Sequence, residues 1–519
     1  MENLIKKLDL NEYITNFSKL FAREKPIILE GDINIHYKII SELSNYNINQ
    51  PSSVQNLDSQ LMHIQKQGIL RVYEIYEFIK IINYFLYLKR FNFQGKLLEW
   101  MDKIVIPNEI LKICEYFDDK ANLKEGVDED FDNIKQAIYK NKEEIKQSLY
   151  KTINSSKIKP YLVDMQVHFI NEQECLLVRG GFNHILSGSV IDRSNSGFFY
   201  VIPHSVSDLK QKQSDLKNKQ EEILFRLCKE ISHIFERNLL FLKFINKEFD
   251  RFDHYQARIF FSKIGDKNFI LPSKKDENRL VDFCHPALSS PRPISIDFSK
   301  SVIMITGVNA GGKTMMLKSI LSAIFLSKYL LPYNAHKSTV VSNFKSINAV
   351  LDDPQSVKND ISTFAGRMLE FSKLFEVKNA IVGVDEIELG TDSDEAASLF
   401  KVIIEDLIKN DIKIIITTHH KRLAALMASN PDVELIAALY DEENQRPTYQ
   451  FLQGTIGRSY AFETALRYKI PAGVVKRAKE VYGEDKDRLN ELIERSSELE
   501  REYRQKIANL DSEIENYKR

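Results

Sequence analysis

The sequence predicts a mostly α-helical region followed by an α/β domain, in which helices cover a mainly parallel sheet. Up to about residue 267, apolar residues recur mainly at the three- and four-residue steps of an amphipathic helix. From residue 268, short apolar runs at 302–306, 380–384 and 412–416 alternate with helical stretches. This alternation is typical of parallel strands that are joined by helices.

The helical region divides into two parts. Residues 1–120 combine helix-period apolar patterns with few turn signals, and they predict a packed helical core. Residues 121–267 predict a long helical lever arm, because two charged helical segments flank a strand-like insert at about 161–203. In this insert, Gly180-Gly181 and Ser194–Gly197 separate the apolar runs as turns.

The α/β domain is expected to cover residues 268–483. Residues 484–519 then show apolar positions three and four apart with dense charge between them, which predicts a coiled-coil helix. No capping residue ends this helix before Arg519. Arg519 is therefore not necessarily the residue at which the natural protein stops.

The composition favours a soluble, cytoplasmic protein. With 519 residues and 43% apolar content, the chain is long enough for several domains. The net charge of −1 gives no global attraction to nucleic acid or membrane, so a polyanion site must be a local patch. The four cysteines form no C-x-x-C pair, and neither a signal peptide nor a membrane span is apparent. We expect reduced thiols and no membrane partner.

The most specific motif is a phosphate-binding loop. The segment 307–314 fits the pattern G-x-x-x-x-G-K-[ST], with an apolar run before it and an apolar helix after it. Backbone N–H groups of such a loop bind phosphate oxygens at a helix N-terminus. The complete pattern disfavours a chance glycine turn. The predicted ligands of a nucleoside triphosphate are Gly307, Val308, Asn309, Ala310, Gly311, Gly312, Lys313 and Thr314, of which Thr314 also holds Mg²⁺.

Polar residues follow the other two apolar runs. Asp385-Glu386 comes directly after 380–384 and suits a Walker B role. Asp385 would hold Mg²⁺ through water, and Glu386 would orient or deprotonate the attacking water. The alternative is that two acids merely end a strand. His419 leaves the third run and is a candidate sensor of the γ-phosphate; His420 is the weaker candidate, because adjacent residues of a strand point in opposite directions.

Together these segments resemble the ATPase domain of the MutS family, an ABC-type dimeric ATPase, over roughly residues 275–485. Taken alone, Ser362-Thr363-Phe364 predicts only a helix N-cap. The segments that match in order and spacing are His285–Leu288, Thr306–Thr314, Ser362–Phe364, Asp385–Ile387, Gly390-Thr391, Thr418-His419, Gly457–Glu463 and Ile470-Pro471. Gly390–Asp392 and Arg193–Pro203 are similar to the second bacterial branch, which lacks the mismatch-reading domain.

The resemblance implies ATP and Mg²⁺ as cofactors, hydrolysis with Glu386 and His419 as catalytic residues, and Mg²⁺ at Thr314 and Asp385. It also implies that Ser362 acts in trans on the nucleotide of the partner subunit, and hence a homodimer through the ATPase domains. Two positions depart from the family pattern. Val308 replaces the usual proline, and Glu388-Leu389 is unusual before Gly390.

For the whole protein, the resemblance implies an ATP-dependent dimeric clamp that binds branched or recombination-intermediate DNA and suppresses homologous recombination. The alternative within the family is a sensor of collided ribosomes that splits them with ATP. Basic residues near the arm are candidate phosphate contacts, although interleaved acids favour a plain solvated face: Lys157, Lys159, Arg179, Arg193, Lys210 and Lys212.

Two hypotheses belong to other classes. A structural ABC ATPase of chromosome maintenance would carry a signature that Leu186–Ser189 superficially matches, but this segment precedes the phosphate loop. A nucleotide-binding module without turnover would leave Glu386 idle. The branch usually carries a C-terminal nuclease domain; none is visible in this chain, so we expect no nuclease activity from it.

Overall fold

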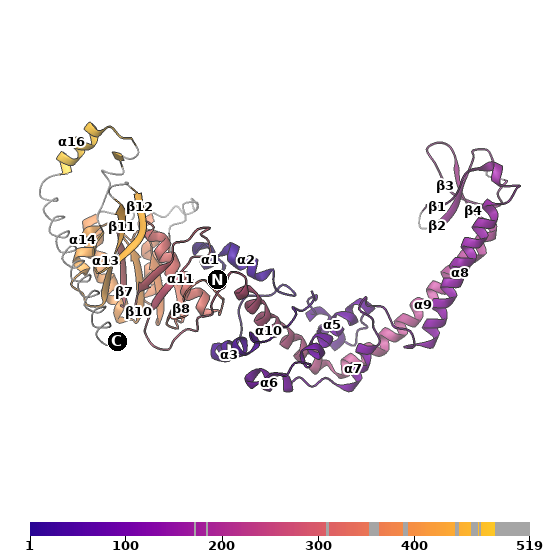
Figure 1. The fold of residues 1–519 in the computed structure, drawn as a ribbon, viewed down its shortest axis with the longest axis horizontal. Helices are drawn as coiled ribbons and strands as arrows, with labels where there is room; N and C mark the ends of the chain where they lie inside the picture. The colour runs from indigo at the N-terminus through magenta and orange to yellow at the C-terminus, as the bar shows by residue number, and fades with distance from the viewer. Residues whose placement is uncertain are drawn as a thin grey trace, which may run out of the picture. The chain divides into compact units, whose positions relative to one another are not determined.

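A computed structural model of the chain describes residues 1–170, 173–182, 185–307, 311–351, 363–387, 393–441, 446–457, 465–466 and 469–482 (Figure 1). The fold is mixed, with helices and a mainly parallel sheet, as the sequence predicts. The chain forms two compact units. One is Pro51–Phe252, and the other combines Met1–Gln50 with the described residues from Asp253 onward.

The unit Pro51–Phe252 begins with short helices around one long buried helix. Its first helices are α4 (Asp58–Gln65), α5 (Val72–Leu88), α6 (Gly95–Asp102) and α7 (Asn108–Glu115). In α5, Ile75, Phe78, Ile82 and Phe85 are all buried. Their steps of three and four place them on one face, which explains why this segment forms the centre of the helical core.

The arm consists of two antiparallel helices with a sheet between them in the chain. Its elements are α8 (Glu129–Ile153), the short 3-10 helix Lys159–Tyr161, β1 (Leu162–Ile170), β2 (Gln173–Val178), β3 (Gly188–Arg193), β4 (Phe199–Pro203) and α9 (His204–Arg237). The sheet is antiparallel in the order β1-β2-β4-β3. Ile145 and Leu149 of α8 pack against it together with Leu176 and Val201, so a small apolar core joins the sheet to the helices.

The second unit is built on a six-stranded sheet in the order β12-β11-β7-β10-β9-β8. All neighbouring pairs are parallel except β11 with β12. The strands are β7 (Val302–Thr306), β8 (Ser346–Val350), β9 (Ala380–Val384), β10 (Ile412–Thr417), β11 (Val433–Asp441) and β12 (Arg446–Gln453). A separate pair is formed by β5 (Arg279–Phe283) and β6 (Ile294–Asp297). The strand β10 therefore lies between β7 and β9.

Helices cover both faces of this sheet, and the alternation along β7 shows how. Ile303 and Ile305 belong to the apolar cluster of α11 (Lys313–Lys328). Val302 and Met304 belong to a second cluster on the other face. That cluster includes residues of α12 (Thr363–Leu374), α13 (Ser393–Lys409) and α14 (Lys421–Met427). Successive residues of a strand point to opposite faces, so the continuous apolar run reflects burial on both sides.

The first 50 residues, which the sequence suggests as part of the helical core, group with the six-stranded sheet. They contain α1 (Glu2–Lys7), α2 (Asn11–Ser18) and α3 (Ile33–Leu43). Lys7 Nζ donates to Ala349 O of β8 at 2.7 Å, and Lys318 Nζ of α11 lies 2.6 Å from the Asp9 carboxylate. In the part of the chain that the structure describes, two further helices are α10 (Leu239–Lys263) and α16 (Ala472–Tyr482). Among the described residues, no helix is long and apolar enough to cross a membrane.

Candidate nucleotide site

The predicted site residues lie where three neighbouring strands end. Gly307 follows β7, Asp385 follows β9, and Thr418 follows β10, which runs between these two strands. The backbone continues the sheet beyond the strands, since the Thr418 amide donates to Ile305 O and the Asp385 amide donates to Val350 O, both at 3.0 Å. The carboxyl ends of parallel strands are the usual ligand-binding edge of an α/β sheet.

The described part of the phosphate loop has the backbone that the motif requires. Gly307 has φ +117° and Gly312 has φ +86°, a region that side chains disfavour. A Cβ atom on Gly307 would lie 3.0 Å from Ala438 O. Gly312 is the N-cap of α11, and Lys313, its first residue, is buried and donates to Gly307 O at 2.8 Å. The loop thus presents the first turn of a helix and one ammonium group, a suitable pair for phosphate.

The Asp385 carboxylate accepts hydrogen bonds from hydroxyl groups on two different elements. Thr314 Oγ1, in the first turn of α11, lies 3.0 Å from both carboxylate oxygens of Asp385. Thr417 Oγ1, at the end of β10, donates to Asp385 Oδ1 at 2.5 Å. A hydroxyl and a carboxylate oxygen are the hard ligands that Mg²⁺ prefers. The side chains present at Thr314 and Asp385 therefore fit a magnesium ion bound with a nucleotide.

Glu386 occupies a strained position. Its φ of +45° is rare for a residue with a side chain and costs about 1–3 kcal/mol. Its amide donates to Thr417 Oγ1 at 2.8 Å, and its carbonyl accepts a hydrogen bond from Arg367 of α12. The side chain itself is half-buried. Neither Thr417 nor Arg367 was predicted from the sequence; a polar residue at the end of an apolar run is the only signal for Thr417, and Arg367 has none.

The two histidines that follow β10 differ in exposure. His419 is exposed and His420 is half-buried, with their ring centroids 4.9 Å apart. The His420 amide donates to Thr418 Oγ1 at 2.9 Å, and His420 is the N-cap of α14. His420 thus starts a helix. The side chain of His419 is exposed, at the same edge of the sheet as Asp385.

Two more residues border the phosphate loop, and the sequence did not suggest a role for either. Tyr449 of β12 is 52% exposed, and its Cδ1 atom would lie 3.3 Å from a Cβ on Gly312. Gly457 donates its amide to Thr306 Oγ1 at 2.7 Å. A Cβ on Gly457 would lie 2.6 Å from the Gly307 Cα, so only glycine fits there. An exposed ring and a closely packed backbone thus flank the loop.

Some predicted positions lie outside the residues that the structure describes. They are Val308, Asn309 and Ala310 of the phosphate loop, Ser362, Glu388–Asp392, Arg458–Glu463 and the predicted coiled-coil helix 484–519. Gly311 is described and buried.

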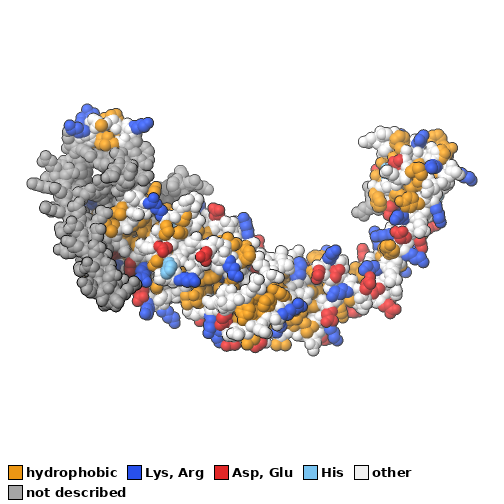
Figure 2. All heavy atoms as spheres, viewed as in Figure 1, with side chains coloured by type: hydrophobic (Ala, Val, Ile, Leu, Met, Phe, Trp, Pro, Cys, Tyr) orange, Lys and Arg blue, Asp and Glu red, His pale blue; other side chains and the backbone are white. Residues whose placement is uncertain are grey.

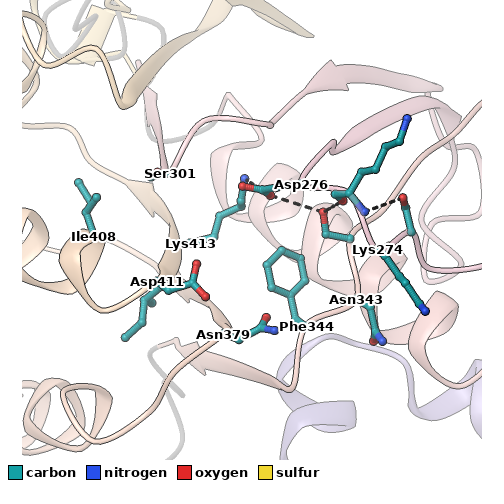
Figure 3. A pocket seen from close by; sticks show the side chains of 13 residues that line it. Lys274, Asp276, Ser301, Asn343, Phe344, Asn379, Ile408, Asp411 and Lys413 are labelled. Carbon is teal, nitrogen blue, oxygen red and sulfur yellow. Dashed lines mark hydrogen bonds and ion pairs between the residues drawn. The ribbon is translucent and has the colours of Figure 1, made fainter.

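A polar hollow of about 420 Å³ lies at the opposite edge of the sheet (Figure 3). Its walls include Ser301, Asn379 and Ile412, which adjoin the starts of β7, β9 and β10. The buried Lys413 lies 3.3 Å from Asp276 in this hollow, and burial lowers the pKa of its ammonium group. It contains none of the predicted nucleotide-site residues, so we do not assign the nucleotide to it.

The basic residues predicted near the arm have different surroundings. Lys210 forms an ion pair with Glu174, and Lys212 lies 3.6 Å from Glu144. The Arg193 guanidinium lies 5.3 Å from the centre of the Phe199 ring. These pairings agree with the simpler reading of a solvated face, and Figure 2 shows blue and red side chains interleaved along the arm.

Of the other three basic residues, Arg179 contacts Tyr161, and Lys159 lies in the same 3-10 helix as Tyr161. Lys157, Lys159 and Arg179 are exposed. The Arg179 amide donates to Tyr161 O at 2.9 Å, and the Tyr161 and Phe182 ring centroids are 5.0 Å apart. We call these five residues the basic–aromatic patch.

Comparisons of the sequence with protein families and with curated proteins point to the same family. Residues 303–485 match the family model of MutS domain V. Two proteins named Endonuclease MutS2, from Helicobacter pylori strains 26695 and J99, are each 44% identical over 519 residues, which is 98% of this chain and 68% of the relative. Endonuclease MutS2 of Streptococcus uberis is 32% identical over 348 residues, or 66% of this chain and 44% of that protein.

Proposed function

Since this chain belongs to the MutS family as a MutS2-type member, we propose that it hydrolyses ATP at the site formed by the ends of β7, β9 and β10. The observation that carries the proposal is the convergence of Lys313, Thr314, Asp385 and Glu386 at one edge of the sheet. Strand cleavage, which the name of the relatives states for those proteins, is not part of the proposal.

Each side chain has a distinct task in this proposal. The Lys313 ammonium group and the amides of the first turn of α11 bind the phosphates. Thr314 and Asp385 would hold Mg²⁺, which would offset the negative charge of the phosphate oxygens. Glu386, fixed by its backbone, orients the attacking water and accepts its proton. His419, at the end of the strand between the phosphate loop and Asp385, senses the γ-phosphate.

We further propose that Tyr449 binds the base. Its exposed ring lies beside Gly312, the N-cap of the helix that receives the phosphates. An aromatic ring at the border of a phosphate site can stack on a nucleobase, which provides about 1–3 kcal/mol. This position would add affinity for a nucleotide over a simple polyphosphate.

The proposed active form is a homodimer in which Ser362 of one subunit acts on the nucleotide of the other. In this form, the arms act as a clamp on branched DNA and so suppress recombination. The basic–aromatic patch supports a polyanionic cargo, because cationic groups bind phosphates and an exposed ring such as that of Phe182 can stack on an unpaired base. A ribosome is the second candidate cargo, since its RNA offers the same chemistry.

Two experiments test the proposal. The first measures ATP turnover and ATP affinity of Glu386→Gln. We expect turnover to fall by at least about 100-fold while ATP still binds, because the carboxylate acts on water and not on the phosphates. Undiminished turnover would show that Glu386 does not activate the water.

The second experiment identifies the cargo. Binding of a four-way DNA junction, linear duplex DNA and purified ribosomes is compared at one salt concentration, with ATP and with ADP. Preference for the junction supports the DNA clamp, and preference for ribosomes supports the second candidate. Equal affinity for junction and linear duplex, with weaker binding to ribosomes, contradicts both.

A further inference from the structure

We propose that Arg367 is a positioning residue that holds Glu386 in its catalytic conformation and couples it to helix α12. The inference rests on the proposed ATPase function and extends it to a residue outside the recognised motifs. Arg367 is only 3% exposed, and its guanidinium donates a hydrogen bond to Glu386 O. A charged group is rarely buried to this degree unless it is paired or hydrogen-bonded, so this contact contributes to holding the guanidinium in place.

The contact fixes one specific peptide unit. In the peptide unit that joins Glu386 to Ile387, the Glu386 carbonyl oxygen accepts a hydrogen bond from Arg367. The Ile387 N–H of the same unit donates to Thr417 O at 3.3 Å. This peptide plane is therefore held from α12 on one side and from β10 on the other. The orientation of this plane sets the ψ torsion of Glu386.

The backbone conformation of Glu386 requires contacts that keep it in place. Its φ of +45° is strained, and strained residues keep their conformation only where their surroundings over-determine it. Thr417 provides the contacts from β10, namely Oγ1 to the Glu386 amide and O to the Ile387 amide. Arg367 provides the contact from the other side. Without it, the plane can rotate about its remaining anchor and the carboxylate moves away from the water.

Arg367 also connects Glu386 to the start of α12, because this helix begins at Thr363, one residue after Ser362 in the sequence. A shift of α12 along its axis changes the position of Arg367 and therefore of Glu386. Arg367 thus connects the helix that starts beside the proposed trans residue with the carboxylate that acts on the subunit's own nucleotide.

The test is a double-mutant cycle of Arg367→Met and Glu386→Gln, read by single-turnover hydrolysis and by ATP affinity. We expect Arg367→Met to lower the hydrolysis rate about 10- to 100-fold, the value of a hydrogen bond from a charged donor, with ATP affinity unchanged within about twofold. In the Glu386→Gln background, the same change should cost less than about twofold. Arg367→Lys, which keeps the charge and a donor, should recover part of the rate.

Lys373→Met is the matched control, since it removes an exposed charge from the same helix and should leave the rate unchanged. An equal loss in both backgrounds, or none in either, overturns the positioning role. If Arg367→Met does not fold, the cycle is run with Arg367→Gln, a shorter uncharged donor, and the same outcomes apply. If the unaltered protein does not hydrolyse ATP, the proposed function fails; if Glu386→Gln alone keeps full turnover, the proposed role of Glu386 fails. Both results are distinct from a failure of the Arg367 inference, which shows as an equal loss, or none, in the two backgrounds.

Discussion

Thr417 donates a hydrogen bond from its hydroxyl to Asp385 Oδ1 at 2.5 Å, which joins the end of β10 to the end of β9. The Thr417 hydroxyl oxygen also accepts a hydrogen bond from the Glu386 amide, at 2.8 Å. One hydroxyl group therefore holds both members of the acidic pair. Thr417 is fully buried, so water cannot replace these contacts without entering the sheet edge.

The first prediction concerns this hydroxyl. Thr417→Val keeps the shape of the side chain but removes both hydrogen bonds, and we expect the hydrolysis rate to fall about tenfold and the free energy of unfolding by about 1–3 kcal/mol. Thr339→Val is a matched control, because buried Thr339 makes a similar pair of bonds to the Val281 backbone away from the site. The control should lose stability but not activity. Enzyme assays and thermal melting measure both; equal activity losses would refute a specific role.

The second prediction concerns recognition of the base. Tyr449→Ala should weaken ATP binding by roughly 5- to 150-fold, the equivalent of about 1–3 kcal/mol of stacking, whereas Tyr449→Phe should bind as the unaltered protein does. Binding of inorganic triphosphate, which has no base, should be unaffected by either change. Calorimetry with both ligands measures the difference. A parallel loss for triphosphate would mean that the ring supports the loop and does not stack.

The third prediction uses two glycines with different surroundings. Gly457→Ala places a Cβ 2.6 Å from the Gly307 Cα, so the backbone of the phosphate loop must move, and we expect ATP affinity to fall more than about tenfold. Gly473→Ala in α16 is the control, since a Cβ there meets nothing within 4 Å and alanine favours the helix. Nucleotide titrations compare the two. Normal affinity in Gly457→Ala would show that the loop tolerates displacement.

The fourth prediction is a dependence of stability on pH from His285. Burial lowers the pKa of His285 to about 4, with the Asp9 charge opposing this shift and Lys318 adding to it. His285 Nδ1 accepts the Ala287 amide at 3.2 Å, and its other nitrogen lies 3.0 Å from Ser322 Oγ, an arrangement that suits the neutral ring. The unfolded chain, with a pKa near 6.5, binds the proton first as the pH falls.

Stability should therefore be constant above about pH 6.5 and decline towards pH 4, by a total on the order of 3 kcal/mol from this residue. Urea unfolding at several pH values measures the decline. In His285→Gln, which cannot titrate, the decline should be smaller by this amount. An identical pH profile for the variant would assign the decline to other groups.

The fifth prediction tests the basic–aromatic patch. If Lys157 and Lys159 contact phosphates, changing both to glutamine should reduce the salt dependence of duplex binding, by about 0.9 in the log–log slope for each lost contact. Lys212→Gln is the control, because its ammonium group already lies near Glu144. ATP turnover without nucleic acid should not change in either variant. An unchanged slope in the double variant would locate the cargo elsewhere.

The sequence predicts the strands at whose ends the site lies, but it does not predict the order of these strands in the sheet. The runs 302–306, 380–384 and 412–416 correspond to β7, β9 and β10, because strands buried on both faces leave a continuous apolar signal. Nothing in that signal states which strands are neighbours. The insertion of β10 between β7 and β9 brings Thr417 to Asp385, and it is set by long-range packing.

The contacts of three other residues were not predicted from the sequence. Arg367 donates to a carbonyl, Gly457, although it lies in a segment that resembles the family, allows a close approach to Gly307, and Tyr449 borders the loop from a strand more than 100 positions later. Such roles depend on contacts between distant segments and leave no local pattern. Lys313 and Asp385 could be proposed from the sequence because their chemistry requires a fixed residue type at a fixed place next to a strand.

The contact between Lys7 and Ala349 joins residues 342 positions apart, and it has a consequence for biosynthesis. At about 5–20 residues per second, the strand β8 is made roughly 20 to 70 s after α1. During that interval, Leu8, Leu10 and Phe17 have no partner from α11 to pack against. The intervening unit Pro51–Phe252 is complete in sequence before α11 is made. The nascent chain must therefore keep an apolar N-terminal segment from aggregating until translation supplies its sheet.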